Sequence, residues 1–260
     1  MEYLDGLPIW IFFMGMVIVV LAASEIGFRF GIRLQDRGSF PGESRMTNSV
    51  VGGMLGLVAF LMAFSIGINI GHHGERKSMV VTEANAIGVA WLRAGFLEET
   101  DSRLMRKLLR EYAQVRIAAS NKEIELPAAL KRSEQIHGEL WVIVERNVRQ
   151  GNDSDVMATL VEAVNDLINT HLIRLTAAYK RLPNILGIVL IMATVLSFLL
   201  VGVASSADRK RDTPAILLFA IVFSSVLMIM VDLDRPQEGT LTISQTAMAD
   251  VLRRIEPLSE

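Results

Sequence analysis

Apolar residues are gathered along this chain into four long stretches that contain almost no charged side chains. Each stretch is close to the roughly 20 residues that an α-helix needs to cross the hydrocarbon core of a bilayer. The pattern therefore predicts four transmembrane helices, over residues 8–28, 49–70, 185–204 and 215–231. The mean hydropathy of +0.39 agrees, because it is high for a water-soluble globular protein.

The first stretch has an alternative interpretation as a secretory signal peptide. Such peptides begin with basic residues and have an apolar core of roughly 7 to 15 residues before a cleavage site flanked by small residues. Here the preceding segment carries Glu2 and Asp5 without any Lys or Arg, the apolar run is longer, and no such site follows it. These features favour a retained transmembrane helix.

Short polar segments connect the apolar stretches in pairs. Residues 29–47 join the first two and contain the turn formers Gly38, Pro41 and Gly42, while residues 205–213 join the last two. Each pair is therefore predicted to form a hairpin.

Between the two hairpins lies a polar region in which apolar residues recur at helical spacing. The first such run, which continues the second apolar stretch, is Val80, Ala84, Ile87 and Trp91. No strand-like alternation occurs, so the predicted fold is an all-α membrane protein, with two transmembrane hairpins flanking a soluble helical bundle. The predicted domains are 1–71 for the first hairpin, 72–182 for the soluble domain, 183–232 for the second hairpin and 233–260 for a C-terminal tail.

Composition excludes several classes of function. Without cysteine the chain forms no disulfide, thiolate metal site or iron–sulfur cluster, and the net charge of −2 comes without a basic stripe for nucleic acid. No phosphate-binding glycine loop or nucleophile elbow is present. The adjacent His72 and His73 would point about 100° apart on a helix and lack a third ligand, which favours interfacial histidines over a metal site. We expect no enzyme activity, no cofactor and no bound metal.

The second apolar stretch carries two features that bear on function. Gly52, Gly53 and Gly56 have the spacing that lets helices approach closely in lipid, so we expect them to serve helix packing. Phe60, Phe64 and Ile68 recur every four residues and share one face. Such a face normally contacts lipid or neighbouring helices, but in an oligomer it can form an apolar pore constriction.

Two polar motifs follow the second and fourth apolar stretches. The first contains Glu83, Asn85, Gly88 and Arg93, and the second contains Asp232, Asp234, Arg235 and Pro236. Asn and Gly are poor helix formers, so the first motif indicates close packing between helices or subunits. Charges near the hydrocarbon are costly unless paired or hydrated, so the second indicates a structural ion pair or, alternatively, ion handling.

These motifs, TEANAIGVAWLR over 82–93 and VDLDRPQEG over 231–239, resemble those of the bestrophin-like family. The layout of two hairpins around a helical domain is similar too, so the resemblance covers essentially the whole chain. It implies an oligomer similar to the pentameric anion channels of true bestrophins, in which the second spans surround the pore. Asp232 and Asp234 occupy a place comparable to the bestrophin calcium clasp. Two acids followed by Arg235 suit calcium poorly, however, because it takes six or more oxygens.

The leading hypothesis is a homo-oligomeric, pentameric anion channel of the inner cell membrane, with Phe60, Phe64 and Ile68 at its narrowest ring. Its partners would be the lipid bilayer, further copies of the chain and small inorganic ions. Candidate charges at the pore mouths are Arg45, Arg76 and Lys77. The alternative is a non-conducting scaffold or sensor whose helical domain binds a protein. A transporter is less well supported, because no broken helix or intramembrane charge pair marks a binding site.

The sidedness of the helical domain stays open. Both short loops are basic, which favours loops in the cytoplasm and the domain outside. Basic residues close to the spans on the other side oppose this, namely Arg76, Lys77, Lys180, Arg181 and Arg235. Bestrophins keep their soluble domain in the cytosol, so the resemblance also points the other way.

Overall fold

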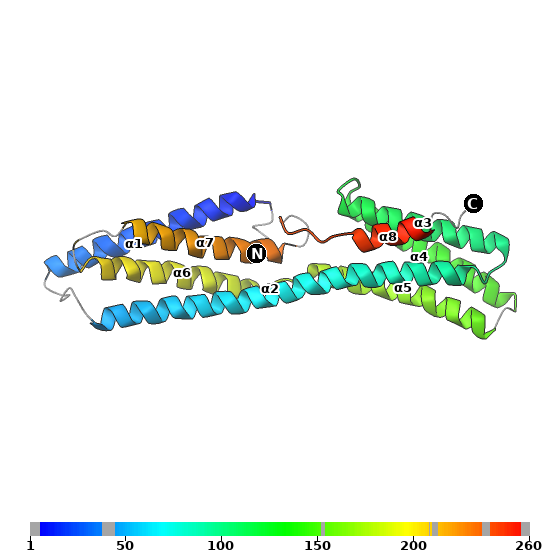
Figure 1. Ribbon diagram of the computed structural model, residues 1–260, viewed down its shortest axis with the longest axis horizontal. Helices are drawn as coiled ribbons and strands as arrows, with labels where there is room; N and C mark the ends of the chain where they lie inside the picture. The colour runs from blue at the N-terminus through cyan, green and yellow to red at the C-terminus, as the bar shows by residue number, and fades with distance from the viewer. Residues whose placement is uncertain are drawn as a thin grey trace. The chain divides into compact units, whose positions relative to one another are not determined.

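The computed structural model describes residues 6–37, 45–151, 154–207, 209, 213–235 and 240–255, and within these ranges it contains helices and no strand (Figure 1). This confirms the predicted all-α class. The helices are α1 (Ile9–Asp36), α2 (Arg45–Ala94), α3 (Glu99–Ser120), α4 (Leu126–Arg149), α5 (Asp155–Tyr179), α6 (Asn184–Ser205), α7 (Thr213–Asp234) and α8 (Thr246–Ile255).

The chain divides into two compact units. The first comprises Met1–His73 and Arg181–Thr242 and holds α1, the first part of α2, α6 and α7. The second comprises Gly74–Lys180 and Ile243–Glu260 and holds the rest of α2 together with α3, α4, α5 and α8.

Four helical stretches are long and apolar enough to cross a bilayer: Ile9–Asp36, Met46–Ala94, Asp155–Ser205 and Thr213–Asp234. Each contains one of the four apolar stretches predicted from the sequence, except that Pro8 of the first stretch directly precedes α1. The third is divided by the non-helical residues 180–183 into α5 and α6, and its most apolar part lies in α6.

In the first unit α1 packs against α6 and α7. The contact with α6 is a direct approach of two helix backbones: a Cβ atom on Gly27 would lie 2.0 Å from the carbonyl oxygen of Leu199, and one on Gly202 would lie 1.9 Å from that of Ser24. Only glycine fits at such positions. Neither Gly27 nor Gly202 is among the three glycines that were predicted to serve helix packing.

The second unit has its own apolar core. Its largest fully buried side chains come from four helices, and they include Ile87 and Trp91 of α2, Met105 and Leu109 of α3, Ile136 and Leu140 of α4, and Leu160 and Leu167 of α5. The run Val80, Ala84, Ile87 and Trp91 is buried, as its helical spacing predicted. Helix α8 packs against α3 and contributes Met248, Val251 and Ile255 to this core.

Candidate functional site

In the first unit α2 presents two different sides. Val58, Met62 and Ser65 are buried on one side. The other side carries Phe60, which is 67% exposed, and Phe64, which is 58% exposed. A Cβ atom added to any of three glycines on this helix would meet no atom within 4 Å, namely Gly52, Gly53 and Gly56. We call these three glycines with Phe60 and Phe64 the open stripe of α2, since no described part of the chain covers it.

Ile68, the third member of the predicted constriction, lies differently. It is only partly exposed and packs against the apolar core of the first unit. The structure therefore keeps Phe60 and Phe64 together on the open stripe and turns Ile68 partly away from it.

The candidate pore-mouth charges also differ from one another. Arg76 is 4% exposed, and its guanidinium donates hydrogen bonds to the carbonyl oxygens of Lys180, at 2.6 Å, and Ala177, at 3.4 Å. Lys77 is exposed. Arg45 begins α2, and its side chain lies outside the described residues.

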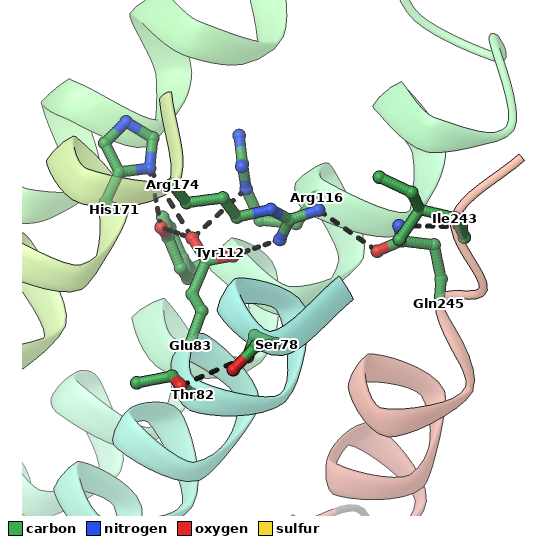
Figure 2. Close-up of polar contacts among 9 residues, drawn as sticks. All are labelled: Ser78, Thr82, Glu83, Tyr112, Arg116, His171, Arg174, Ile243 and Gln245. Atoms are coloured by element: carbon green, nitrogen blue, oxygen red, sulfur yellow. Dashed lines mark hydrogen bonds and ion pairs between the residues drawn. The ribbon is translucent and has the colours of Figure 1, made fainter. Parts of the chain in front are cut away.

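A buried cluster of charged and polar side chains surrounds Glu83 in the second unit (Figure 2). Glu83 is fully buried on α2, and its Oε1 atom accepts a hydrogen bond from the Tyr112 hydroxyl at 2.5 Å. Arg174 of α5 donates to Oε2, and Arg116 Nε lies 3.3 Å from Oε1. The Nδ1 atom of His171 lies 2.8 Å from the Tyr112 oxygen and 3.6 Å from Oε1.

His137 of α4 completes this Glu83 cluster. Its ring centroid lies 5.0 Å from that of Tyr112 and 4.8 Å from that of His171. Arg174 also donates to Gln245 Oε1 at 3.2 Å, which joins the segment before α8 to the cluster (Figure 2). Side chains of α3 and α5 thus meet at the Glu83 carboxylate of α2. His137 of α4 and Gln245 of the C-terminal segment contact those side chains rather than Glu83 itself.

The surroundings hold Glu83, Tyr112 and His137 each in a single protonation state near neutral pH. Burial alone would raise the pKa of Glu83, but the hydrogen bonds of His171 and Tyr112 and the charges of Arg116 and Arg174 outweigh it and keep that pKa well below its usual value. Burial and the Glu83 charge raise the pKa of Tyr112 well above its usual value. Burial, then the neighbouring His171, lowers the pKa of His137 to about 4. These properties suit a structural link, because Glu83 has no proton to exchange near neutral pH.

The first sequence motif is thus only partly gathered in one place. Glu83 lies in the cluster, whereas Asn85 is exposed and Gly88 lies against Val251 of α8. Arg93 donates to the carbonyl oxygen of Thr159.

Sequence reasoning missed the partners of Glu83, which are Tyr112, Arg116, His137, His171 and Arg174. Their spacing in the sequence could have indicated them. Arg116 follows Tyr112 by four positions and Arg174 follows His171 by three, so each arginine lies on or beside a buried face of its helix.

Both carboxylates of the second motif, Asp232 and Asp234, accept hydrogen bonds from backbone amides. Asp232 is 4% exposed and accepts hydrogen bonds from the Thr240 amide at 2.9 Å, the Thr240 hydroxyl at 2.6 Å and the Leu241 amide at 3.2 Å. Asp234 accepts one from the Leu182 amide at 2.7 Å. Pro236 lies outside the described residues.

We searched the described residues for side chains that could bind a metal ion together. No three His, Asp or Glu side chains come together there as ligands for an ion.

Comparison with known families identifies one family for this chain. The profile of the Bestrophin-like domain matches residues 14–248. A crystal structure of a membrane protein variant has a TM-score of 0.68 and 14% identity, covering 96% of this chain and 98% of that one. A variant of a bacterial bestrophin homologue from Klebsiella pneumoniae has a TM-score of 0.68 and 12% identity over the same shares of the two chains. Curated proteins yield no match. At such low identity the solved structures show the fold alone.

Proposed function

Because this chain belongs to the Bestrophin-like family of integral membrane proteins, we propose that it assembles into a homo-oligomeric, pentameric ion channel. In this proposal α2 lines the pore and the ring of Phe60 and Phe64 side chains, with Ile68 at its edge, forms the narrowest point. Chloride or another small anion is the permeant ion, by analogy with true bestrophins.

The observation that carries the proposal is the open stripe of α2. A helix that packs one side on its own unit and leaves small residues and two aromatic rings open on the other can accept copies of itself. Five such helices around an axis would bring five Phe60 and five Phe64 rings together. A narrow apolar ring of this kind excludes water and so closes a pore until it widens.

The proposed topology has two transmembrane hairpins, α1 with α2 and α6 with α7, in a multi-pass protein of the inner cell membrane. Among the candidate mouth charges Lys77 is the first to substitute, because its side chain is exposed whereas that of Arg76 is engaged by carbonyl oxygens. The engagement of Asp232 and Asp234 with backbone amides argues against a calcium-binding role for them.

Ion flux from liposomes tests the proposal. The purified native protein is compared with Phe60→Ala and Phe64→Ala for chloride and potassium flux. We expect each alanine to raise the chloride flux several-fold, because a wider and less apolar ring admits water. Phe30→Ala on α1 is the matched control, since Phe30 is 52% exposed but lies off the open stripe, and its flux should equal that of the native protein.

The competing function is a non-conducting scaffold or sensor. It is favoured by exposed apolar side chains on the second unit, among them Leu92, Phe96 and Leu172. Size-exclusion chromatography and light scattering check that the oligomer is intact. If it is, absence of ion flux from the native protein and from all three alanine variants would reject the channel and leave the scaffold.

A further inference from the structure

A second group of cationic side chains lies around Trp91 in the second unit and takes no part in the Glu83 cluster. Trp91 is 1% exposed on α2. The guanidinium carbon of Arg106 lies 5.4 Å from the centroid of the Trp91 ring, and that of Arg110 lies 5.6 Å from it. The two arginines are one helical turn apart on α3, so both positive charges contact a single ring.

Around this ring, hydrogen-bond donors lack acceptors. The Nε atoms of Arg106 and Arg110 and the Nε1 atom of Trp91 are all buried, and none has a hydrogen-bond partner among the described residues. Arg110 makes one long hydrogen bond through Nη2 to the carbonyl oxygen of Ile255, at 3.5 Å. Neither arginine forms an ion pair with any described Asp or Glu, whereas Arg103 on the same helix pairs with Glu99 at 2.5 Å.

This arrangement is costly as it stands. Buried donors without acceptors lose their hydration, and two neighbouring positive charges repel each other. The Trp91 ring offsets part of the cost by cation–π attraction, and the carbonyl end of α8 contributes a partial negative charge. Neither provides a full negative charge or acceptors for three N–H groups.

An oxyanion would provide both. Guanidinium groups have the planar fork that matches phosphate oxygens, and a phosphate group combines negative charge with several acceptor oxygens. Gly95 also leaves room for the Arg106 guanidinium, because a Cβ atom at this position would lie 2.8 Å from Nη2.

We propose that Arg106, Arg110 and the Trp91 N–H form a binding site for a phosphate group, carried by inorganic phosphate or by an anionic phospholipid headgroup. The site is independent of ion conduction.

Phosphate titration of the full-length protein in detergent tests the proposal, with calorimetry and thermal unfolding as readouts and sodium chloride keeping the ionic strength constant. Inorganic phosphate should bind saturably and raise the melting temperature. Arg106→Gln and Arg110→Gln should each weaken binding by about tenfold or more, since each removes a charge-assisted contact. Arg103→Gln, which removes an exposed arginine already paired with Glu99, should bind as the native protein does.

Two further variants keep the test decisive. If a glutamine variant fails to fold, Arg106→Lys keeps the charge but loses the planar fork, and it should bind more weakly than the native protein. Trp91→Phe keeps an apolar ring without the Nε1 donor and should weaken binding by a few fold.

A competition arm separates the two sources of phosphate. Short-chain phosphatidic acid that displaces inorganic phosphate at a lower concentration identifies a lipid headgroup, and displacement only at a higher concentration identifies free phosphate. The proposal would be overturned if neither compound bound saturably to the native protein. It would also be overturned if Arg106→Gln and Arg110→Gln bound phosphate as tightly as the native protein does. Binding seen only after Glu256→Gln, which removes the carboxylate next to Ile255 in the sequence, would also overturn it.

Discussion

At Glu83 a carboxylate without solvent exposure is held by Tyr112 and Arg116 of α3 and by His171 and Arg174 of α5. Buried ion pairs add little net stability over an apolar core, but removing one partner leaves the others desolvated and uncompensated. Here the loss of the negative charge would leave the buried Arg116 and the partly exposed Arg174 without their shared counter-charge. The single carboxylate is therefore the residue on which the cluster depends.

Glu83→Gln is expected to lower the free energy of unfolding of the protein by about 3 kcal/mol or more, because Arg116 and Arg174 lose their counter-charge. Chemical unfolding in detergent, followed by tryptophan fluorescence, measures this. Glu162→Gln is the control: Glu162 is 68% exposed and lies 3.6 Å from Arg93, so its loss should change stability by less than about 1 kcal/mol. Equal effects of the two changes would contradict a central role for Glu83.

Stability should also depend on pH through His137. Its pKa falls from 6.5 to about 4 on folding, so the unfolded chain binds this proton more readily than the folded chain. The folded state therefore loses stability as the pH falls from 6.5 towards about 4, by about 3 kcal/mol at most. The lowered pKa of Glu83 acts in the same direction below pH 4.5.

Melting temperatures between pH 7.5 and 4.5 test this pH dependence. His137→Phe should flatten the slope, because the phenyl ring fills the site and takes no proton. His73→Gln, a change outside the Glu83 cluster, should leave the slope as it is. A native slope that survives His137→Phe would assign the titration to another group.

At the scale of helices, the approach of α1 to α6 is decided by Gly27 and Gly202. Their missing side chains let carbonyl oxygens of the partner helix come within 2.0 Å of where a Cβ atom would stand. Because lipid tails are as apolar as leucine, association of helices in a membrane relies on such close van der Waals packing.

Gly202→Val is therefore expected to push α1 and α6 apart and destabilise the first unit by about 1–3 kcal/mol or more. Loss of helical circular dichroism on heating in detergent measures the effect. Gly15→Val on α1 provides the comparison, since a Cβ atom there meets nothing within 4 Å, and it should melt as the native protein does. A melting temperature unchanged by Gly202→Val would contradict the tight α1–α6 contact.

For the whole molecule, sidedness is the property that the four-span topology predicts most directly. Residues 121–125 between α3 and α4 and the C-terminal end of the chain belong to the same compact unit. Two insertions in that unit should therefore report the same side of the membrane.

A sidedness reporter placed between Lys122 and Glu125, and in a separate protein after Glu260, should give the same reading. A reporter between the first two spans should give the opposite one, because one span separates it from the helical unit. Different readings from the first two positions would reject the four-span topology.

The sequence alone predicted those features that depend on residues close together along the chain. Apolar length marks the helices that can span a bilayer, and helical spacing identified the buried run from Val80 to Trp91 and the common face of Phe60 and Phe64. The two motifs that resemble the family's were visible for the same reason, since each is a short contiguous segment.

Only the tertiary structure decided which distant segments meet. Spacing predicts which face of a helix is apolar but not which helix covers it, so the packing of α1 on α6 and α7 could not be read in advance. Glu83 finds its partners 29 to 91 positions away along the chain, and Asp232 and Asp234 bind amides of segments outside their own helix. These contacts depend on how whole helices pack, because a buried charge is tolerated only where folding brings its partners to it.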